Sequence, residues 1–244
     1  MPRPVMSGRR GALTALALAA LVAGVVLIVV AVRAQQSAPQ PPRSVGRIDP
    51  SASAGHRAGS TSPSATASPT TTASAEPADT GPKPLGPSRP TRIRIPAIGV
   101  DSVVNALGLA KDGSLAVPQP GPHLNQAAWF DESPTPGQPG PAIIEGHVDS
   151  ELGPSVFFKL GAVRPGNHIL VTRRDGVNLL FEVDAVRDYP KNRFPTTVVY
   201  GGDLHRPQLR LITCSDFDTS THHHIGNEVV FSHLVPGHER HTKG

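Results

Sequence analysis

The chain contains a single cysteine, Cys214, in the stretch RLITCSDFD. A thiol becomes a strong nucleophile when a nearby base or cation favours the thiolate over the free thiol, whose pKa is about 8.5. One cysteine with a distant histidine is the pattern of a cysteine-nucleophile enzyme, and His147 ends an apolar run in IIEGHVDS. Two other interpretations of Cys214 stay open: a small buried apolar side chain, or one half of an intermolecular disulfide.

Short apolar runs must position these two side chains. They are rich in Val, Ile, Leu and Phe and cover Arg92–Ile95, Ile143–His147, His168–Thr172, Leu179–Val186, Leu209–Cys214 and Asn227–Leu234. Turn signals such as RPGN and RRDG separate them, and no stretch keeps a long apolar period of 3.6 residues. About seven or eight short strands predict a mainly β domain, a closed barrel or a sandwich, with one or two short helices. His147 and Cys214 then stand at the ends of two strands.

The positive charge of the chain does not indicate a nucleic-acid partner. The formal net charge is +4, but the basic residues are scattered, with no Lys/Arg stripe and few aromatic side chains beside them to stack on bases. We therefore expect no nucleic-acid binding.

The N-terminal run Gly11–Val32 is uncharged and almost wholly apolar. Roughly 20 such residues span a bilayer as a helix. Three arginines precede the run, so the positive-inside rule places the N-terminus in the cytoplasm. A signal peptide has a shorter apolar region and an A-x-A-like cleavage site, which AVRAQQ lacks. We expect residues 1–33 to be a cytoplasmic N-terminus and a single-pass membrane anchor, with a signal sequence as the alternative.

The remaining chain divides by composition. Residues 34–88 are dominated by Ser, Thr, Ala, Pro and Gly and cannot bury enough apolar surface to offset their ordering entropy. We expect a disordered linker there, a folded extracytoplasmic domain over residues 89–236, and a flexible tail over 237–244.

The folded part resembles a sortase, of the class F type found in actinobacteria. The resemblance rests on an ordered set of segments between about Thr91 and Leu234: TRIRIPAIGVDSVVNALGL, GPAIIEGHVDS with GPSVFFKL, YPKNRFPTTVVYGG and LRLITCSDFD. It implies a sortase-like eight-stranded closed β-barrel whose cysteine and histidine face a substrate groove. It also implies that Cys214 is the nucleophile, that His147 is the proton donor and acceptor, and that no cofactor is needed.

The resemblance further implies partners. Cys214 would attack the Thr–Gly bond of a Leu-Pro-X-Thr-Gly-like signal on surface proteins, forming an acyl-thioester. A cell-wall precursor amine, or water, would then resolve the thioester at the outer face of the cell membrane. The alternative is a degenerate sortase-like domain that binds peptides or envelope partners with little catalysis.

One departure from the family is clear. Sortases use an arginine after the cysteine to stabilise the developing oxyanion, but no Arg or Lys lies between Cys214 and Glu239. Aligning NEVVF with the last strand of the family puts His222–Ile225 where the arginine is sought. Either His224 or His223 is a weaker donor, because imidazole is mostly neutral at pH 7, or an arginine from another loop reaches the site, or activity is impaired. The candidates for such an arginine are Arg173, Arg174 and Arg193.

Two weaker signals are given structural interpretations. The histidine run His222–His224 has no accompanying Cys or HExxH-type spacing, so we expect a solvated loop and no metal site. Asp149 lies two residues after His147, and we interpret it as a turn-forming residue.

Overall fold

A computed structural model describes residues 38–39, 44–46, 84–237 and 240–241. The strands are β1 (Ser44–Gly46), β2 (Pro90–Ile95), β3 (Val100–Leu107), β4 (Ala127–Phe130), β5 (Gly140–Glu145), β6 (Asp149–Ser150), β7 (Gly153–Pro154), β8 (His168–Arg173), β9 (Val177–Pro190), β10 (Pro207–Asp218), β11 (His223–Leu234) and β12 (Arg240–His241). The helical segments are the 3₁₀ turns η2 (Pro96–Ile98), η3 (Leu160–Ala162) and η4 (Lys191–Arg193), and the short helix α2 (Thr196–Tyr200).

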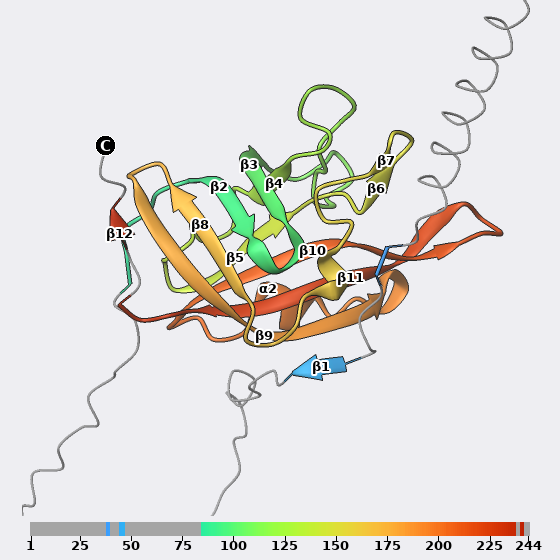
Figure 1. The fold of residues 1–244 in the computed structure, drawn as a ribbon. Helices are drawn as coiled ribbons and strands as arrows, with labels where there is room; N and C mark the ends of the chain where they lie inside the picture. The colour runs from blue at the N-terminus through green and yellow to red at the C-terminus, as the bar shows by residue number, and fades with distance from the viewer. Residues whose placement is uncertain (1–37, 40–43, 47–83, 238–239, 242–244) are drawn as a thin grey trace, which may run out of the picture.

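Eight of the strands close into a barrel (Figure 1). They follow one another in the order β9, β11, β10, β5, β4, β3, β2 and β8, and β8 pairs with β9 to complete the ring. Neighbours are antiparallel except for the pairs β10–β5 and β3–β4, which are parallel. Closure leaves the ring without free edges. The predicted mainly β fold, an eight-stranded closed barrel with very few helices, is confirmed.

The two faces of the barrel wall bury different apolar clusters. The interior is filled from all eight strands and includes Ile93, Val104, Trp129, Ile144, Val171, Phe181, Leu211 and Val230. A second cluster lies on the outer face of β5, β10, β11 and β9: Ile143, Ala185, Val199, Ile212, Val229 and Phe231. Because side chains alternate along a strand, Leu211 points inward and Ile212 outward. Helix α2 contributes Val199 and Tyr200 to this outer cluster.

The strand ends differ from the sequence prediction where the chain becomes polar. β5 ends at Glu145, so His147 follows the strand. β10 continues past Cys214 to Asp218 and pairs with β11 as a long hairpin. This hairpin extends beyond the barrel at the end where β6 and β7 lie (Figure 1). Its outer part is polar, so hydrophobic pattern alone could not reveal it.

Two ranges predicted to lack structure contain short strands. β1, within the expected linker, pairs with Ala185–Arg187 of β9, and β12, within the expected tail, pairs with Val177 and Asn178 of the same strand. Leu85 also packs against the core, and its N–H donates to the Gly137 carbonyl at 2.8 Å. The barrel therefore makes contacts that begin before residue 89.

The predicted membrane anchor, Gly11–Val32, lies outside the described residues. Within the described part of the chain, no helix combines the length and the apolar composition that crossing a bilayer requires.

Candidate active site

The parallel pairing of β5 and β10 brings His147 and Cys214 to the same place. The register sets Glu145 opposite Ile212, and two contacts continue it: the Gly146 N–H donates to the Ile212 carbonyl at 3.2 Å, and the Thr213 hydroxyl donates to the Gly146 carbonyl at 2.8 Å. The next residues along the two chains are His147 and Cys214. Sequence reasoning paired these two residues, and the register, continued by two positions beyond Glu145 and Ile212, leads to both.

Gly146 is required by the packing next to His147. A Cβ at this position would overlap the side chains of Val156 and Phe157. Phe157 is fully buried, and its N–H donates to the His147 carbonyl at 3.0 Å. The loop after His147 therefore folds back onto the strand end and fixes the histidine backbone.

The His147 ring is held from the other side by a backbone carbonyl. Its Nε2 lies 2.8 Å from the Pro118 oxygen. A carbonyl oxygen can only accept, so Nε2 carries the hydrogen in this contact and His147 is the donor. While this hydrogen bond lasts, Nδ1 is the ring nitrogen available to exchange a proton.

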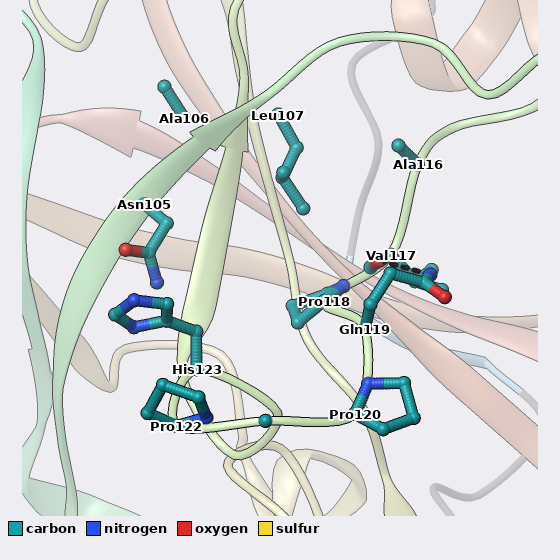
Figure 2. A pocket seen from close by; sticks show the side chains of 11 residues that line it. Asn105, Ala106, Leu107, Ala116, Val117, Pro118, Gln119, Pro120, Pro122 and His123 are labelled. Atoms are coloured by element: carbon teal, nitrogen blue, oxygen red, sulfur yellow. Dashed lines mark hydrogen bonds between the residues drawn. The ribbon is translucent and has the colours of Figure 1, made fainter.

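Pro118 belongs to the wall of a cavity of about 450 Å³ between β3 and the segment 116–123. Figure 2 shows the Asn105 and His123 side chains close together at one side of this cavity. The Gln126 Oε1 accepts from the Asn105 amide at 2.8 Å and lies 2.8 Å from the His123 Nδ1. These contacts tie the proline-rich segment to β3 and so support the carbonyl that orients His147.

Cys214 lies on the outer face of the barrel wall, half-buried. The antiparallel register places Asn227 of β11 directly opposite it, and Tyr189 of β9 opposite Asn227. Directly opposite residues share a face, so the three side chains Cys214, Asn227 and Tyr189 form a transverse row over three adjacent strands, and His147 follows the end of the neighbouring strand β5. The sequence analysis did not single out Asn227 or Tyr189; the hairpin register, once known, identifies both.

The two candidate histidines occupy different positions on the β10–β11 hairpin. His224 pairs with Phe217, on the face opposite to Cys214 by strand alternation. Its Nε2 lies 3.0 Å from the Asp149 Oδ1, and its buried Nδ1 has no hydrogen-bond partner among the described residues. His223 is exposed near the turn. Asp149 therefore contacts His224, and it lies in β6, where we had expected a turn-forming residue.

The arginines considered as substitutes are placed away from Cys214 or are already engaged. The Arg173 guanidinium is buried and donates to Asp175, to the Pro136 carbonyl and to the Gly86 carbonyl, each at 2.7 Å. Its strand, β8, is separated from β10 by β9 and β11 in the ring. Arg174 and Arg193 are exposed, in the turn after β8 and in η4.

Arg210, which sequence reasoning did not consider, shares the outer face of β10 with Cys214. Its guanidinium stacks on the Phe231 ring at 4.6 Å, and burial lowers its pKa to about 10. Four residues of strand, about 13 Å, separate it from the cysteine. Arg210 therefore packs the outer cluster and does not reach the thiol.

The inner face behind Cys214 carries two acidic side chains, the buried Glu228 and the partly exposed Asp188. The Ser215 hydroxyl donates to Asp188, and Glu228 stands opposite Asp188 in the β9–β11 pairing. Burial raises the pKa of Glu228 to about 8, and it also raises the pKa of Asp188. A Cβ at Gly226 would overlap the Ser215 hydroxyl, so glycine is needed there. No group of three or more His, Cys, Asp or Glu side chains that could hold a metal ion occurs within the described residues.

Glu145 is a second buried carboxyl, on the outer face two residues before His147. Its Oε1 is buried without a hydrogen-bond partner among the described residues. Burial raises the pKa of Glu145 to about 8. The pKa of the neighbouring Tyr200 is also raised, first by burial and then by repulsion from ionised Glu145. At neutral pH this carboxyl is therefore mostly protonated, as expected for an unpaired acid in an apolar site.

Comparison with solved structures finds similar proteins at low identity. They include sortase A from Corynebacterium diphtheriae (22% identity, TM-score 0.47), sortase C-1 from Actinomyces oris (20%, 0.46) and sortase A from Listeria monocytogenes (16%, 0.47). The matches cover 61%, 59% and 65% of this chain and 61%, 73% and 93% of the other chains, in that order. The chain thus spans less than two thirds of the length of the Corynebacterium protein.

Comparison with curated proteins found no match. A family model described as the sortase domain matches residues 93–235. This match covers more than half of the chain and includes both His147 and Cys214. The chain belongs to the sortase family.

Proposed function

We propose that this protein is a membrane-anchored cysteine transpeptidase of the class F type, which cleaves a Leu-Pro-X-Thr-Gly-like sorting signal and joins the released protein to a cell-wall amine. The observation that carries the proposal is the parallel pairing of β5 with β10, which continues through Gly146 and Thr213 and so brings His147, just after β5, close to Cys214 of β10. A thiol beside an imidazole is the arrangement that activates a cysteine nucleophile.

In the first half-reaction, the Cys214 thiol gives its proton to the His147 Nδ1, the resulting thiolate attacks the threonine carbonyl carbon, and the carbonyl π electrons move to oxygen. When the tetrahedral intermediate collapses, the carbon–nitrogen bond breaks, and the leaving glycine amine takes a proton from the His147 Nδ1. The product is an acyl-thioester on Cys214. An incoming amine then gives its proton to His147 and attacks the thioester, restoring the thiolate; water in its place gives hydrolysis.

Partly exposed aromatic side chains on the outer face of the wall that carries Cys214 support a peptide substrate. Tyr189, Phe194 and Tyr200 pack onto the outer cluster, with Tyr189 and Phe194 in an edge contact at 6.0 Å between ring centroids. Aromatic side chains provide apolar contact surface at low conformational cost. Such a surface suits the leucine and proline of a sorting signal.

A second candidate function is favoured by the absence of an arginine. With no Arg or Lys between Cys214 and Glu239, the domain would keep the peptide groove with little turnover. It would then bind sorting-signal-like peptides or envelope partners.

One experiment separates these two functions. The full chain in detergent is incubated with a Leu-Pro-X-Thr-Gly peptide library and hydroxylamine, and mass spectrometry follows the peptide hydroxamate and the acyl adduct on Cys214. We expect both products, and we expect both to disappear in Cys214→Ala with an unchanged melting temperature. Peptide binding without either product, from folded protein, would contradict the transpeptidase and support the binding module.

A further inference from the structure

The proposed reaction needs a hydrogen-bond donor that the family arginine would ordinarily supply. Negative charge develops on the threonine carbonyl oxygen when Cys214 attacks. A donor placed in advance at that oxygen stabilises the transition state, and loss of one such donor typically costs a factor of about 10²–10³ in kcat. The donor must lie on the outer face of the barrel wall, close to the Cys214 Sγ.

Asn227 meets this geometric requirement. It is directly opposite Cys214 in the antiparallel β10–β11 pair, and opposite residues have Cβ atoms about 4.5–5.5 Å apart on one face. The same face continues outward along β11 through Ile225, which is exposed, and inward through Val229, which is buried in the outer cluster. Asn227 is therefore at the boundary between the apolar cluster and solvent, where the thiol also lies.

The Asn227 carboxamide is available to a substrate. No hydrogen bond engages its side chain within the described residues, and the residue is half-exposed. Two other candidates are already engaged: His224 with Asp149 at 3.0 Å, and the more distant Arg173 with Asp175 at 2.7 Å. A neutral amide N–H is a weaker donor than guanidinium, but carboxamides serve this role in oxyanion holes.

We propose that Asn227 is a catalytic residue whose Nδ2–H donates to the oxyanion of the tetrahedral intermediate, in place of the arginine. This assignment rests on the proposed transpeptidase function. The carbonyl π electrons move to the oxygen as the sulfur–carbon bond forms, and the amide of Asn227 holds that charge without giving up its proton. When the carbonyl re-forms, the carbon–nitrogen bond breaks and the His147 proton goes to the leaving amine.

The test compares Asn227→Ala and Asn227→Asp with wild type and with Asn192→Ala. Asp has the shape of Asn but lacks the N–H donors, and it adds a negative charge beside the oxyanion. Asn192 is an exposed residue of η4 and controls for loss of a carboxamide elsewhere. Four quantities are measured on the full chain: kcat, KM, the rate of Cys214 alkylation by iodoacetamide, and the melting temperature.

We expect Asn227→Ala to lower kcat by about 10²–10³, with KM within about threefold of wild type. Asn227→Asp should lose at least as much. In Asn227→Ala the alkylation rate should be unchanged, because alkylation forms no oxyanion, and so should the melting temperature; a merely structural role would change these two quantities as well. Asn192→Ala should match wild type in all four measurements.

Two different failures are distinguishable. If wild type makes product and Asn227→Ala retains kcat within about fivefold, Asn227 is not the donor, while the transpeptidase proposal stands. If folded wild type makes neither product nor acyl adduct, the proposed function fails and the Asn227 assignment fails with it.

Discussion

The wall formed by β5, β10, β11 and β9 carries polar side chains on both faces, and the two sets differ in their partners. On the outer face, Cys214 and Asn227 are half-exposed, and within the described residues Asn227 has no side-chain hydrogen bond. On the inner face, Thr213 and Ser215 alternate with Cys214, are almost fully buried and donate to partners in the wall.

This difference suggests that the outer face serves the reaction and that the inner face supports the backbone. Uncommitted polar groups at a half-exposed position are available to a substrate, whereas buried polar groups must find partners inside the protein. The inner set fixes the backbone that carries the outer set: the Thr213 hydroxyl bridges to the Gly146 carbonyl at 2.8 Å, next to His147. Changes on the outer face should therefore affect turnover, and changes on the inner face should affect stability.

The largest effect is expected from His147→Gln on the outer side. Glutamine keeps an N–H donor for the Pro118 carbonyl but cannot exchange a proton, so turnover should fall by about 10²–10⁴. Because the donor contact is kept, the melting temperature should stay within a few degrees of wild type. Steady-state kinetics with a sorting-signal peptide and thermal unfolding measure the two quantities. Full turnover in His147→Gln would show that the proton comes from another group.

A stability effect that depends on pH is expected from Glu228→Gln on the inner face. Burial raises the pKa of Glu228 to about 8, while in the unfolded chain its pKa is about 4.3. Between these values the folded state holds a proton that the unfolded state releases, so wild type loses stability as pH rises from about 5 to about 8. The substituted glutamine does not titrate, so the variant should gain roughly 2–4 kcal/mol over wild type across this range.

Urea unfolding at pH 5, 6.5 and 8 tests this expectation. Glu145 is buried in both proteins, so its contribution cancels in the difference between them. A stability difference between variant and wild type that is the same at pH 5 and pH 8 would mean that Glu228 titrates normally in the folded protein.

The smallest effect is expected from the contact between Asp149 and His224, which joins the loop after His147 to the distal hairpin. Their side chains are 42% and 17% exposed, and polar side-chain contacts at this exposure contribute about 0.2–1 kcal/mol. A double-mutant cycle with Asp149→Asn and His224→Gln should give a coupling in this range. His224→Gln should also lower turnover less than Asn227→Ala does. A larger loss of turnover in His224→Gln than in Asn227→Ala would indicate that His224 is the oxyanion donor.

The barrel was predictable because its strands carry their own apolar signal. Leu211–Thr213 and Val229–Phe231 are short runs of apolar or β-branched residues that predict buried strands. β3 was not predicted as a strand, because its buried positions are Ser102 and Val104, separated by the exposed Val103. The polar ends of β10 and β11 were missed because their pairing is set by hairpin register, which carries no hydropathy signal.

The candidate site was predictable only in part, because some of its residues belong to chemically distinctive types and others do not. Cys214 and His147 belong to residue types that carry chemistry, so the sequence alone could nominate them. Asn227 is a common polar residue within NEVVF and becomes notable once it stands opposite Cys214. The search for the missing arginine was directed at His222–Ile225 because sequence alignment cannot give cross-strand positions.

The pairing of β1 with β9 limits the distance at which the barrel can lie from the membrane. If Gly11–Val32 spans the bilayer as proposed, residues 33–43 alone join the membrane to the docked strand at Ser44. That length reaches at most about 40 Å when fully extended. Residues 47–83 come after the docked strand in the sequence, so lengthening them would leave this reach unchanged. Substrates would therefore have to come close to the lipid surface to reach Cys214.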